Sequence, residues 1–241
     1  MIANAHIGTS GWSYRHWHGP FYPADLPRKR ELEFYADHFA AVELNNTFYS
    51  LPAADTLADW AQRTPDGFRF SAKLSRYATH MKKLKDPQEP LQRFLDRISV
   101  LGPKAGPVLV QLPPNWRFDE PRLADFLDVL DPRYRYAFEF RDPSWFDDRA
   151  LDLLARHDAA LCCYDLAGHT SPRQAITDFV YVRLHGPEPG YQGSYDTATL
   201  AGWAGALSTW SRQGRDVYVF FDNDADGHAP LDAARLAGML S

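Results

Sequence analysis

The sequence predicts a closed α/β barrel of eight strand-and-helix units, and two observations lead to this fold class. Short runs rich in Val, Ile, Leu and aromatic residues recur along the whole chain, and helical patterns lie between most of them. Strands that alternate with helices pair in parallel through crossover helices. Eight such units in 241 residues match the roughly 250 residues of a TIM (β/α)8 barrel.

An open, doubly wound parallel sheet is the alternative fold for such an alternation. The chain, however, has no G-x-G-x-x-G turn and no shift of composition that would mark a second domain. We therefore interpret residues 1–241 as one barrel domain.

The expected strands are eight apolar runs in chain order. They are His6–Thr9, Ala41–Asn45, Phe68–Leu74, Val108–Leu112, Tyr136–Arg141, Ala160–Asp165, Val180–His185 and Val217–Asp222. Apolar residues at the helical spacing i, i+3, i+4, i+7 follow several of them, as in the segments 32–39, 91–101, 123–130 and 200–210. The sixth unit is the exception, because Leu166–Asp178 contains Gly168 and Pro172. We expect its helix to be short or irregular.

The composition is that of an ordinary globular protein, with 45% hydrophobic and 24% charged residues and a formal net charge of −5. This mild acidity argues against non-specific coating of DNA. The longest stretch without Asp, Glu, Lys or Arg, Thr197–Ser211, has 15 residues and is too short for a membrane span. Residues 1–12 lack the pattern of a secretion signal, and Cys162 and Cys163 are adjacent, so we expect a protein of the reducing cytoplasm.

The alternation of each strand predicts which side chains point into the barrel. Val180, Val182 and Leu184 are expected to face the helices, which turns Arg183 and His185 inward. The same reasoning applied to the other strands gives a set of polar residues at the C-terminal strand ends, here called the mouth residues, with the sixth strand ambiguous in phase. They are Ser10, Glu43, Asn45, Lys73, Gln111, Glu139, Arg141, Asp165, Arg183, His185 and Asp222.

Two interpretations of the mouth residues are open. Buried charges are costly unless they are paired or bind something, so the set is either a structural lattice of ion pairs or a ligand site. The charges gather at one end of the strands, where TIM barrels build their active sites, and this favours the ligand site. Aromatic side chains in the loops at this end, among them Trp12, Tyr14 and Tyr49, would suit a sugar or a base.

We hypothesise an enzyme that acts on a small phosphorylated or carboxylated ligand with a sugar-like or nucleotide-like body. Arg141 and Arg183 would clamp the anion. Glu43 or Glu139 would be the general base, and His185 or Lys73 the general acid. The reaction class stays open among hydrolase, isomerase and lyase, and a Schiff base on Lys73 is an alternative. The other mouth residues and the loop aromatics would bind substrate, namely Ser10, Trp12, Tyr14, Asn45, Tyr49, Gln111, Asp165 and Asp222.

The sequence predicts neither a metal ion nor a cofactor. No H-E-x-x-H, Walker loop, G-x-S-x-G or C-x-x-C motif is present. At the mouth, Lys73, Arg141 and Arg183 would repel a metal ion from the carboxylates.

Several segments together resemble the YecE-like family, also called domain of unknown function 72. The resemblance lies in Gly8–Tyr14, Val42–Tyr49, Gln111–Pro114, Phe138–Arg141, Tyr181–Gly186 and Val217–Asn223, in this order and over nearly the whole chain. It implies a TIM barrel, likened to the xylose-isomerase and endonuclease-IV type, and supplies no substrate, because the family has no established reaction. Two residues depart from the expected pattern: Asn46 stands in place of a small Ser, and Asp222 in place of Asn.

Two further hypotheses belong to other classes of function. A nucleic-acid-binding or nuclease-like protein would use the loop aromatics together with Lys82, Lys83 and Lys85. A non-catalytic sensor would bind its ligand at the same mouth. The sequence predicts no membrane association and sets no oligomeric state.

Overall fold

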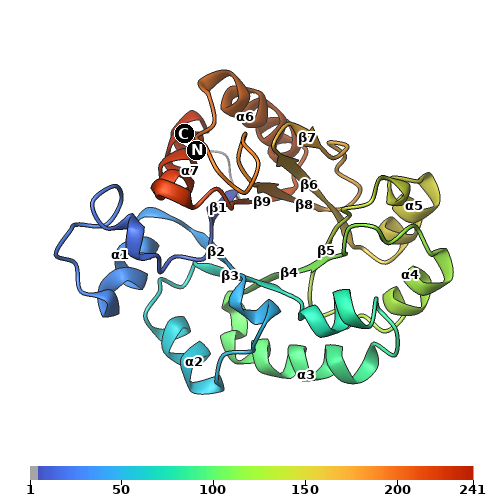
Figure 1. Cartoon of the computed structure of the whole chain (residues 1–241). Helices are drawn as coiled ribbons and strands as arrows, with labels where there is room; N and C mark the ends of the chain where they lie inside the picture. The colour runs from blue at the N-terminus through green and yellow to red at the C-terminus, as the bar shows by residue number, and fades with distance from the viewer. Residues whose placement is uncertain (1–4, 241) are drawn as a thin grey trace.

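Eight parallel strands close into a ring in the computed structural model, which describes residues 5–240 (Figure 1). The strands are β1 (Ala5–Ser10), β2 (Ala41–Leu44), β3 (Arg69–Lys73), β4 (Ala105–Gln111), β5 (Tyr136–Glu139), β6 (Ala160–Leu166), β8 (Phe179–Leu184) and β9 (Asp216–Phe221). Each strand pairs in parallel with its neighbours, and the pairings β1–β9 and β5–β6 complete the ring. The predicted (β/α)8 barrel is thus confirmed, with every strand within two or three residues of its expected place.

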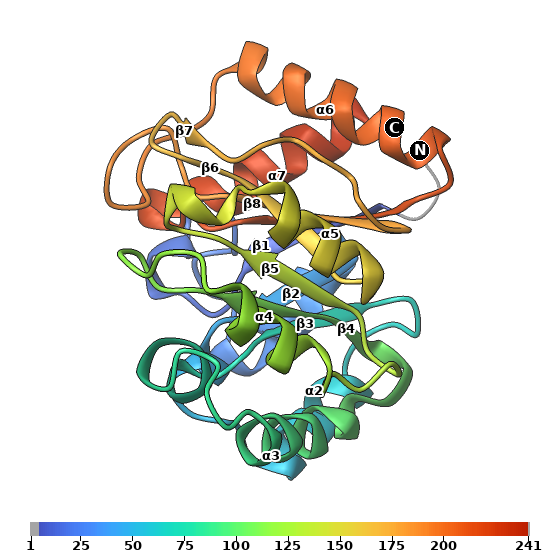
Figure 2. The ribbon, with the colours of Figure 1, turned by 90° about the vertical axis from the view of Figure 1, so that its right-hand side faces the viewer.

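Helices surround the ring of strands (Figures 1 and 2). The α-helices are α1 (Glu31–His38), α2 (Ala54–Gln62), α3 (Gln88–Ile98), α4 (Glu120–Leu127), α5 (Asp148–Arg156), α6 (Thr197–Arg212) and α7 (His228–Met239). Shorter helical turns are η1 (Arg15–Trp17), η2 (Arg28–Arg30), η3 (Asn46–Phe48), η5 (Ser99–Lys104), η6 (Pro143–Trp145), η7 (Ala225–Gly227) and the π-helix η4 (Tyr77–Met81). Within residues 5–240, none of the helices combines the length and apolarity that crossing a bilayer requires.

The sixth unit has no helix between β6 and β8. The chain leaves β6 through a turn at Ala167 and Gly168, which have φ values of 51° and 79°, and forms the short antiparallel strand β7 (His169–Thr170). Residues 171–178 then run to β8 as irregular chain. The sequence predicted that Gly168 and Pro172 would make the sixth helix short or irregular, and in the structure this segment forms no helix.

Two apolar clusters confirm the predicted strand phase. The larger contains Val180, Val182 and Leu184 together with helix residues such as Phe94, so it lies between the strands and the helices. The smaller cluster contains strand residues and no helix residue, and it therefore fills the inside of the ring. Its members are Ala41, Leu109, Ala137, Ala160, Cys162, Phe179, Tyr181, Tyr218 and Phe220. The residues of the smaller cluster fill the barrel interior, and the polar mouth residues lie beyond them at the C-terminal ends of the strands.

Gly8 allows β1 and β2 to approach the helix α1 closely. A Cβ atom built on Gly8 would lie 1.8 Å from the carbonyl oxygen of Ala41 and 2.8 Å from the hydroxyl of Tyr35. The Tyr35 hydroxyl accepts a hydrogen bond from the Thr9 amide at 2.8 Å and donates to the Ala41 carbonyl at 3.0 Å. Because the clash would involve backbone, a side chain at position 8 would push the two strands apart.

We expect Gly8→Ala to lower the free energy of unfolding by about 3 kcal/mol or more, since the obstructing atom belongs to the backbone. Gly202→Ala is the matched control, because Gly202 lies in α6 with open space around its Cβ position. That change should stabilise the protein by about 0.5–1 kcal/mol. Urea denaturation measures both. Equal midpoints for Gly8→Ala and the unchanged protein would contradict the close approach.

Candidate functional site

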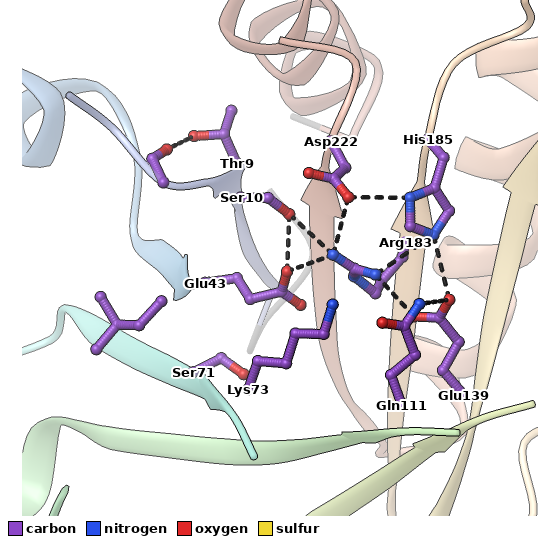
Figure 3. Close-up of polar contacts among 12 residues, drawn as sticks. Thr9, Ser10, Glu43, Ser71, Lys73, Gln111, Glu139, Arg183, His185 and Asp222 are labelled. Atoms are coloured by element: carbon purple, nitrogen blue, oxygen red, sulfur yellow. Dashed lines mark hydrogen bonds and ion pairs between the residues drawn. The ribbon is translucent and has the colours of Figure 1, made fainter. Parts of the chain in front are cut away.

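Arg183 on β8 lies at the centre of the mouth, with only 1% of its side chain exposed (Figure 3). Its guanidinium group donates to Glu43 at 2.7 Å, to Glu139 at 2.8 Å and to Asp222 at 2.9 Å. The three carboxylates come from β2, β5 and the residue after β9, so this one cation joins three separate parts of the ring. Charge-assisted bonds of this length are the strong kind, and they repay the burial of the charges.

Neighbouring polar groups hold the two glutamates in place. Glu43 accepts hydrogen bonds from the Ser10 hydroxyl at 2.8 Å and, at its other oxygen, from the Tyr181 hydroxyl at 2.6 Å. Glu139 accepts from the Gln111 amide at 3.1 Å and from the Nε of Arg141. Both oxygens of each carboxylate therefore accept at least one hydrogen bond.

His185 is fully buried and lies among charged side chains. Its Nδ1 is 3.0 Å from Asp222. Its Nε2 is 3.0 Å from the Nη2 of Arg141 and 3.4 Å from an oxygen of Glu139. Asp222, one of the two departures from the family pattern, thus pairs with both Arg183 and His185.

The cations hold two of the carboxylates in their ionised form. Burial alone would raise the pKa of Glu139, but Arg141 and Arg183 outweigh it and keep that pKa well below its usual value. Burial likewise acts against ionisation of Asp222, and the Arg183 cation, followed by a hydrogen bond with His185, reverses the effect and lowers its pKa. A carboxylate with a lowered pKa accepts a proton poorly. The geometry therefore does not favour the predicted role of Glu139 as general base, nor that of Glu43, whose oxygens are both occupied.

The predicted arginine clamp is also not open at Arg183. Both of its Nη atoms bond to carboxylates, and its Nε is buried without a partner within residues 5–240. Arg141 is bonded to Glu139 and His185, yet its Nη1 has no hydrogen-bond partner within the same part of the chain. The lattice of ion pairs considered from the sequence thus describes Arg183 and its carboxylates, whereas Arg141 keeps one donor without a partner in residues 5–240 that could meet an anion.

Lys73 differs from every other charged mouth residue. Its Nζ lies 4.4 Å from the centre of the Phe48 ring, and it makes no hydrogen bond or ion pair with any residue between 5 and 240. Figure 3 shows the amine pointing toward the space beside Glu43 and Arg183 with no dashed line. Burial and, after it, the Arg183 cation lower the pKa of Lys73 to about 8.

The structure places Asp165 outside the cluster, which corrects one sequence-based assignment. In β6, Ala160 and Cys162 belong to the inner apolar cluster and Cys163 to the outer one, so Asp165 has the outward phase. One oxygen of the Asp165 carboxylate is buried without a partner within residues 5–240, and burial raises its pKa. Tyr164 takes the inward position instead.

Three aromatic residues outside the predicted set of ligand-binding residues lie at the mouth, although Phe48 and Tyr191 belong to the loops that the sequence placed there. The Arg141 guanidinium stacks 5.1 Å from the Tyr164 ring centre, and the rings of Tyr164 and Tyr191 lie edge-on to His185 at 6.2 and 5.3 Å. Phe48 lies beneath the Lys73 amine. For Tyr164 the missing signal was the phase of β6, because Cys162 and Cys163 are equally apolar.

The remaining predicted ligand-binding residues divide between two cavities. Trp12, Tyr14 and Asn45 line a cavity of 260 Å³, in which Trp12 packs edge-on against Trp60 at 4.7 Å. Asn46, the second departure from the family pattern, lies in the same wall. Tyr49 is 80% exposed and points away from this cavity into a different one.

No group of three or more His, Cys, Asp and Glu side chains is arranged to hold a metal ion within residues 5–240. The carboxylates that come nearest to such a group surround the Arg183 guanidinium instead.

A closed ring of eight parallel strands, with its polar residues at the C-terminal strand ends, defines this chain as a TIM-barrel protein. The comparison with known sequences then gives the family. The chain belongs to the family described as "Protein of unknown function DUF72", whose profile matches residues 6–241. The resemblance to the YecE-like family is thereby confirmed.

Two curated relatives agree with this assignment. The UPF0759 protein YecE of Escherichia coli K12 is 34% identical over 142 residues, which make up 58% of this chain and 50% of YecE. The match thus spans about half the length of YecE. The UPF0759 protein YunF of Bacillus subtilis is 26% identical over 269 aligned positions, covering 98% of this chain and 94% of YunF.

Solved structures of the family share the fold. A DUF72 family protein from Thermotoga maritima superposes with a TM-score of 0.88 at 28% sequence identity, covering 98% of each chain. A DUF72 family protein from Enterococcus faecalis gives a TM-score of 0.82 at 19% identity, covering 98% of this chain and 95% of its own.

We expect Arg183→Met to lower the free energy of unfolding by about 3–5 kcal/mol at neutral pH, because three carboxylates lose their shared cation. The pH dependence should change as well. In the unchanged protein, the lowered pKa values of Glu139 and Asp222 give stability that is present above about pH 4 and is lost as the pH falls. In the variant the buried carboxylates favour protonation, so stability should fall as the pH rises.

Urea midpoints between about pH 4 and pH 8 test both statements. Arg156→Met is the control, because Arg156 is exposed on α5 and bonds only to a carbonyl of its own helix. A variant at position 183 with the stability and pH profile of the unchanged protein would show that the lattice does not hold the ring.

Proposed function

We propose that this protein is an enzyme that carries out acid–base chemistry, without a metal ion or other cofactor, on a small ligand bound at the mouth of the barrel. The ligand carries a phosphate or a carboxylate on a sugar-like or nucleotide-like body. One observation carries the proposal: Lys73 keeps a partly buried amine without a polar partner in residues 5–240, beside ion pairs that satisfy the other central charges.

The Lys73 amine is suited to accept a proton at neutral pH. With a pKa of about 8, a useful fraction of it is uncharged, whereas an ordinary lysine is almost fully protonated. The same property makes it a nucleophile for carbonyl compounds. In this proposal Glu43 and Glu139 serve a different purpose from the one first expected, because their ion pairs with Arg183 fix the positions of the charges around the amine.

Two features at the C-terminal ends of the strands support an anionic ligand with a ring. The free Nη1 of Arg141 offers a cationic donor at the mouth. Trp12, Tyr14 and Asn45 supply a small, partly apolar cavity at the ends of the adjoining strands. His185 is completely buried, so in this proposal it positions Arg141 and Asp222 and does not meet the ligand.

A non-catalytic sensor would use the same mouth and would differ only in the absence of turnover. An unreacted amine would then serve as a binding group for the anion. The two cases are separated by replacing Lys73 with a cation that cannot lose its proton.

A thermal-shift screen with phosphorylated and carboxylated metabolites identifies ligands, and turnover is then followed for each. We expect kcat/KM to rise with pH up to about 8, as Lys73 loses its proton. Lys73→Met and Lys73→Arg should both lower kcat by about a hundredfold or more, because arginine keeps the charge and cannot act as the base. Where the substrate is a carbonyl compound, borohydride should trap it on Lys73.

Lys29→Met is the control, because Lys29 is exposed in η2 and is not one of the mouth residues. Retained turnover in Lys73→Arg would overturn the proposed role. Ligands that shift the melting temperature without any turnover would identify a sensor.

A further inference from the structure

A second cavity lies outside the ring of strands, among the loops that follow β2 and β3 and the helix α3. Its volume is 370 Å³, and its walls include Tyr49, Tyr77, Lys82, Arg93 and Arg97. It is the size of a site for one small ligand. None of these residues takes part in the lattice around Arg183.

Three cations and one carboxylate, Glu89, line this cavity. Arg93 is exposed on α3 and makes no hydrogen bond or ion pair with any residue between 5 and 240. Lys82 pairs with Asp86 at 3.3 Å, and such an exposed pair contributes little. Arg97 bonds to the carbonyl of Pro52 and keeps its full charge. The cavity therefore has cationic donors without strong internal partners.

The surrounding segment is basic in an otherwise acidic chain. Residues 76–97 contain six basic and three acidic side chains, whereas the rest of the chain contains 20 basic and 28 acidic ones. Charge separated in this way concentrates a positive field at one place and draws anions there. The low overall charge consequently does not describe this face of the protein.

Two tyrosines stand exposed at the same cavity. Tyr49 is 80% exposed and Tyr77 is 49% exposed, and the Lys82 amine lies 5.7 Å from the centre of the Tyr77 ring. Large aromatic residues exposed beside cations are typical of surfaces that stack planar rings and bind phosphate.

The backbone that carries Lys82 and Tyr77 is held in an unusual conformation. Tyr77 begins the π-helix η4, and the following Lys83, Leu84 and Asp86 have left-handed φ values of 47°, 62° and 44°. Leu84 anchors this turn, because its side chain is buried and its amide donates to the Ala78 carbonyl at 2.9 Å. A segment fixed in this way presents Lys82 and Tyr77 with little further ordering on binding.

We propose that this cavity binds a nucleoside phosphate, with the base against the exposed tyrosines and the phosphate at Lys82 and Arg93. The site is separate from Lys73, and the inference does not depend on the reaction proposed above. A nucleoside phosphate can come as a free nucleotide or as one unit of a single strand of RNA or DNA, and the two sources differ in affinity and salt dependence.

Isothermal titration with AMP and UMP, with adenosine and with inorganic phosphate tests the two halves of the ligand. We expect AMP or UMP to bind more tightly than adenosine or phosphate alone. Arg93→Ala should weaken nucleotide binding by about tenfold, the effect of losing one charged hydrogen bond. Tyr49→Ala should weaken nucleotide binding by a similar factor. Tyr49→Phe should bind the nucleotide as tightly as the unchanged protein, because the ring alone is needed for stacking.

Fluorescence anisotropy with labelled single strands of RNA and DNA, about ten nucleotides long, distinguishes a free nucleotide from a nucleic-acid strand as the ligand. An oligonucleotide that binds much more tightly than AMP, with an affinity that falls steeply with salt, supports a strand. Equal affinities support a free nucleotide.

Arg156→Ala is the matched control for charge, because Arg156 is exposed on α5 and is not among the residues that line this cavity. Absence of binding by nucleotides and oligonucleotides at about 1 mM would overturn the inference. So would binding that Arg93→Ala and Tyr49→Ala both leave intact. Neither result would bear on the role of Lys73.

Discussion

The bond of Arg183 to three carboxylates is the constraint on which the rest of the mouth depends. The carboxylates stand on β2, on β5 and just after β9, and a buried cation between them costs little only while all three partners stay in place. The lattice therefore fixes the relative positions of strands that are far apart in the sequence. It also determines which groups are spent on structure and which stay available for chemistry.

What stays available is a small set at the edge of the lattice. Lys73 keeps its amine in a setting that is partly apolar, from Phe48, and partly charged, from the ion-paired groups beside it. Arg141 keeps one donor after bonding to Glu139 and His185. The ion pairs between Arg183 and its three carboxylates hold charges at fixed positions beside the Lys73 amine. This is a form of preorganisation, because these charges need not rearrange when a ligand binds.

Strand phase could be predicted from the sequence because large apolar residues alternate with the inward-facing ones along most strands. On β8, for example, Val180, Val182 and Leu184 alternate with Tyr181 and Arg183 and face the helices. Phase failed in β6, where two cysteines of equal character hid the alternation and Asp165 was assigned in place of Tyr164. The pairing of Arg183 could not be predicted for a different reason. Alternation shows that Arg183 and Glu43 share a space, but it does not show that they satisfy one another and leave no donor for a ligand.

Because no helix lies between β6 and β8, that side of the barrel carries residues 167–178, a mostly irregular segment that we call the strap. The strap is tied to the mouth, because the Ser171 hydroxyl accepts from the Tyr164 amide at 2.8 Å and the Ala167 amide donates to Gly186. Tyr164 thus lies on β6 and His185 directly after β8, and these are the two neighbouring strands that have no helix between them. A change in the length or composition of this strap could reshape ligand preference while the ion-paired floor and the remaining helices stay as they are.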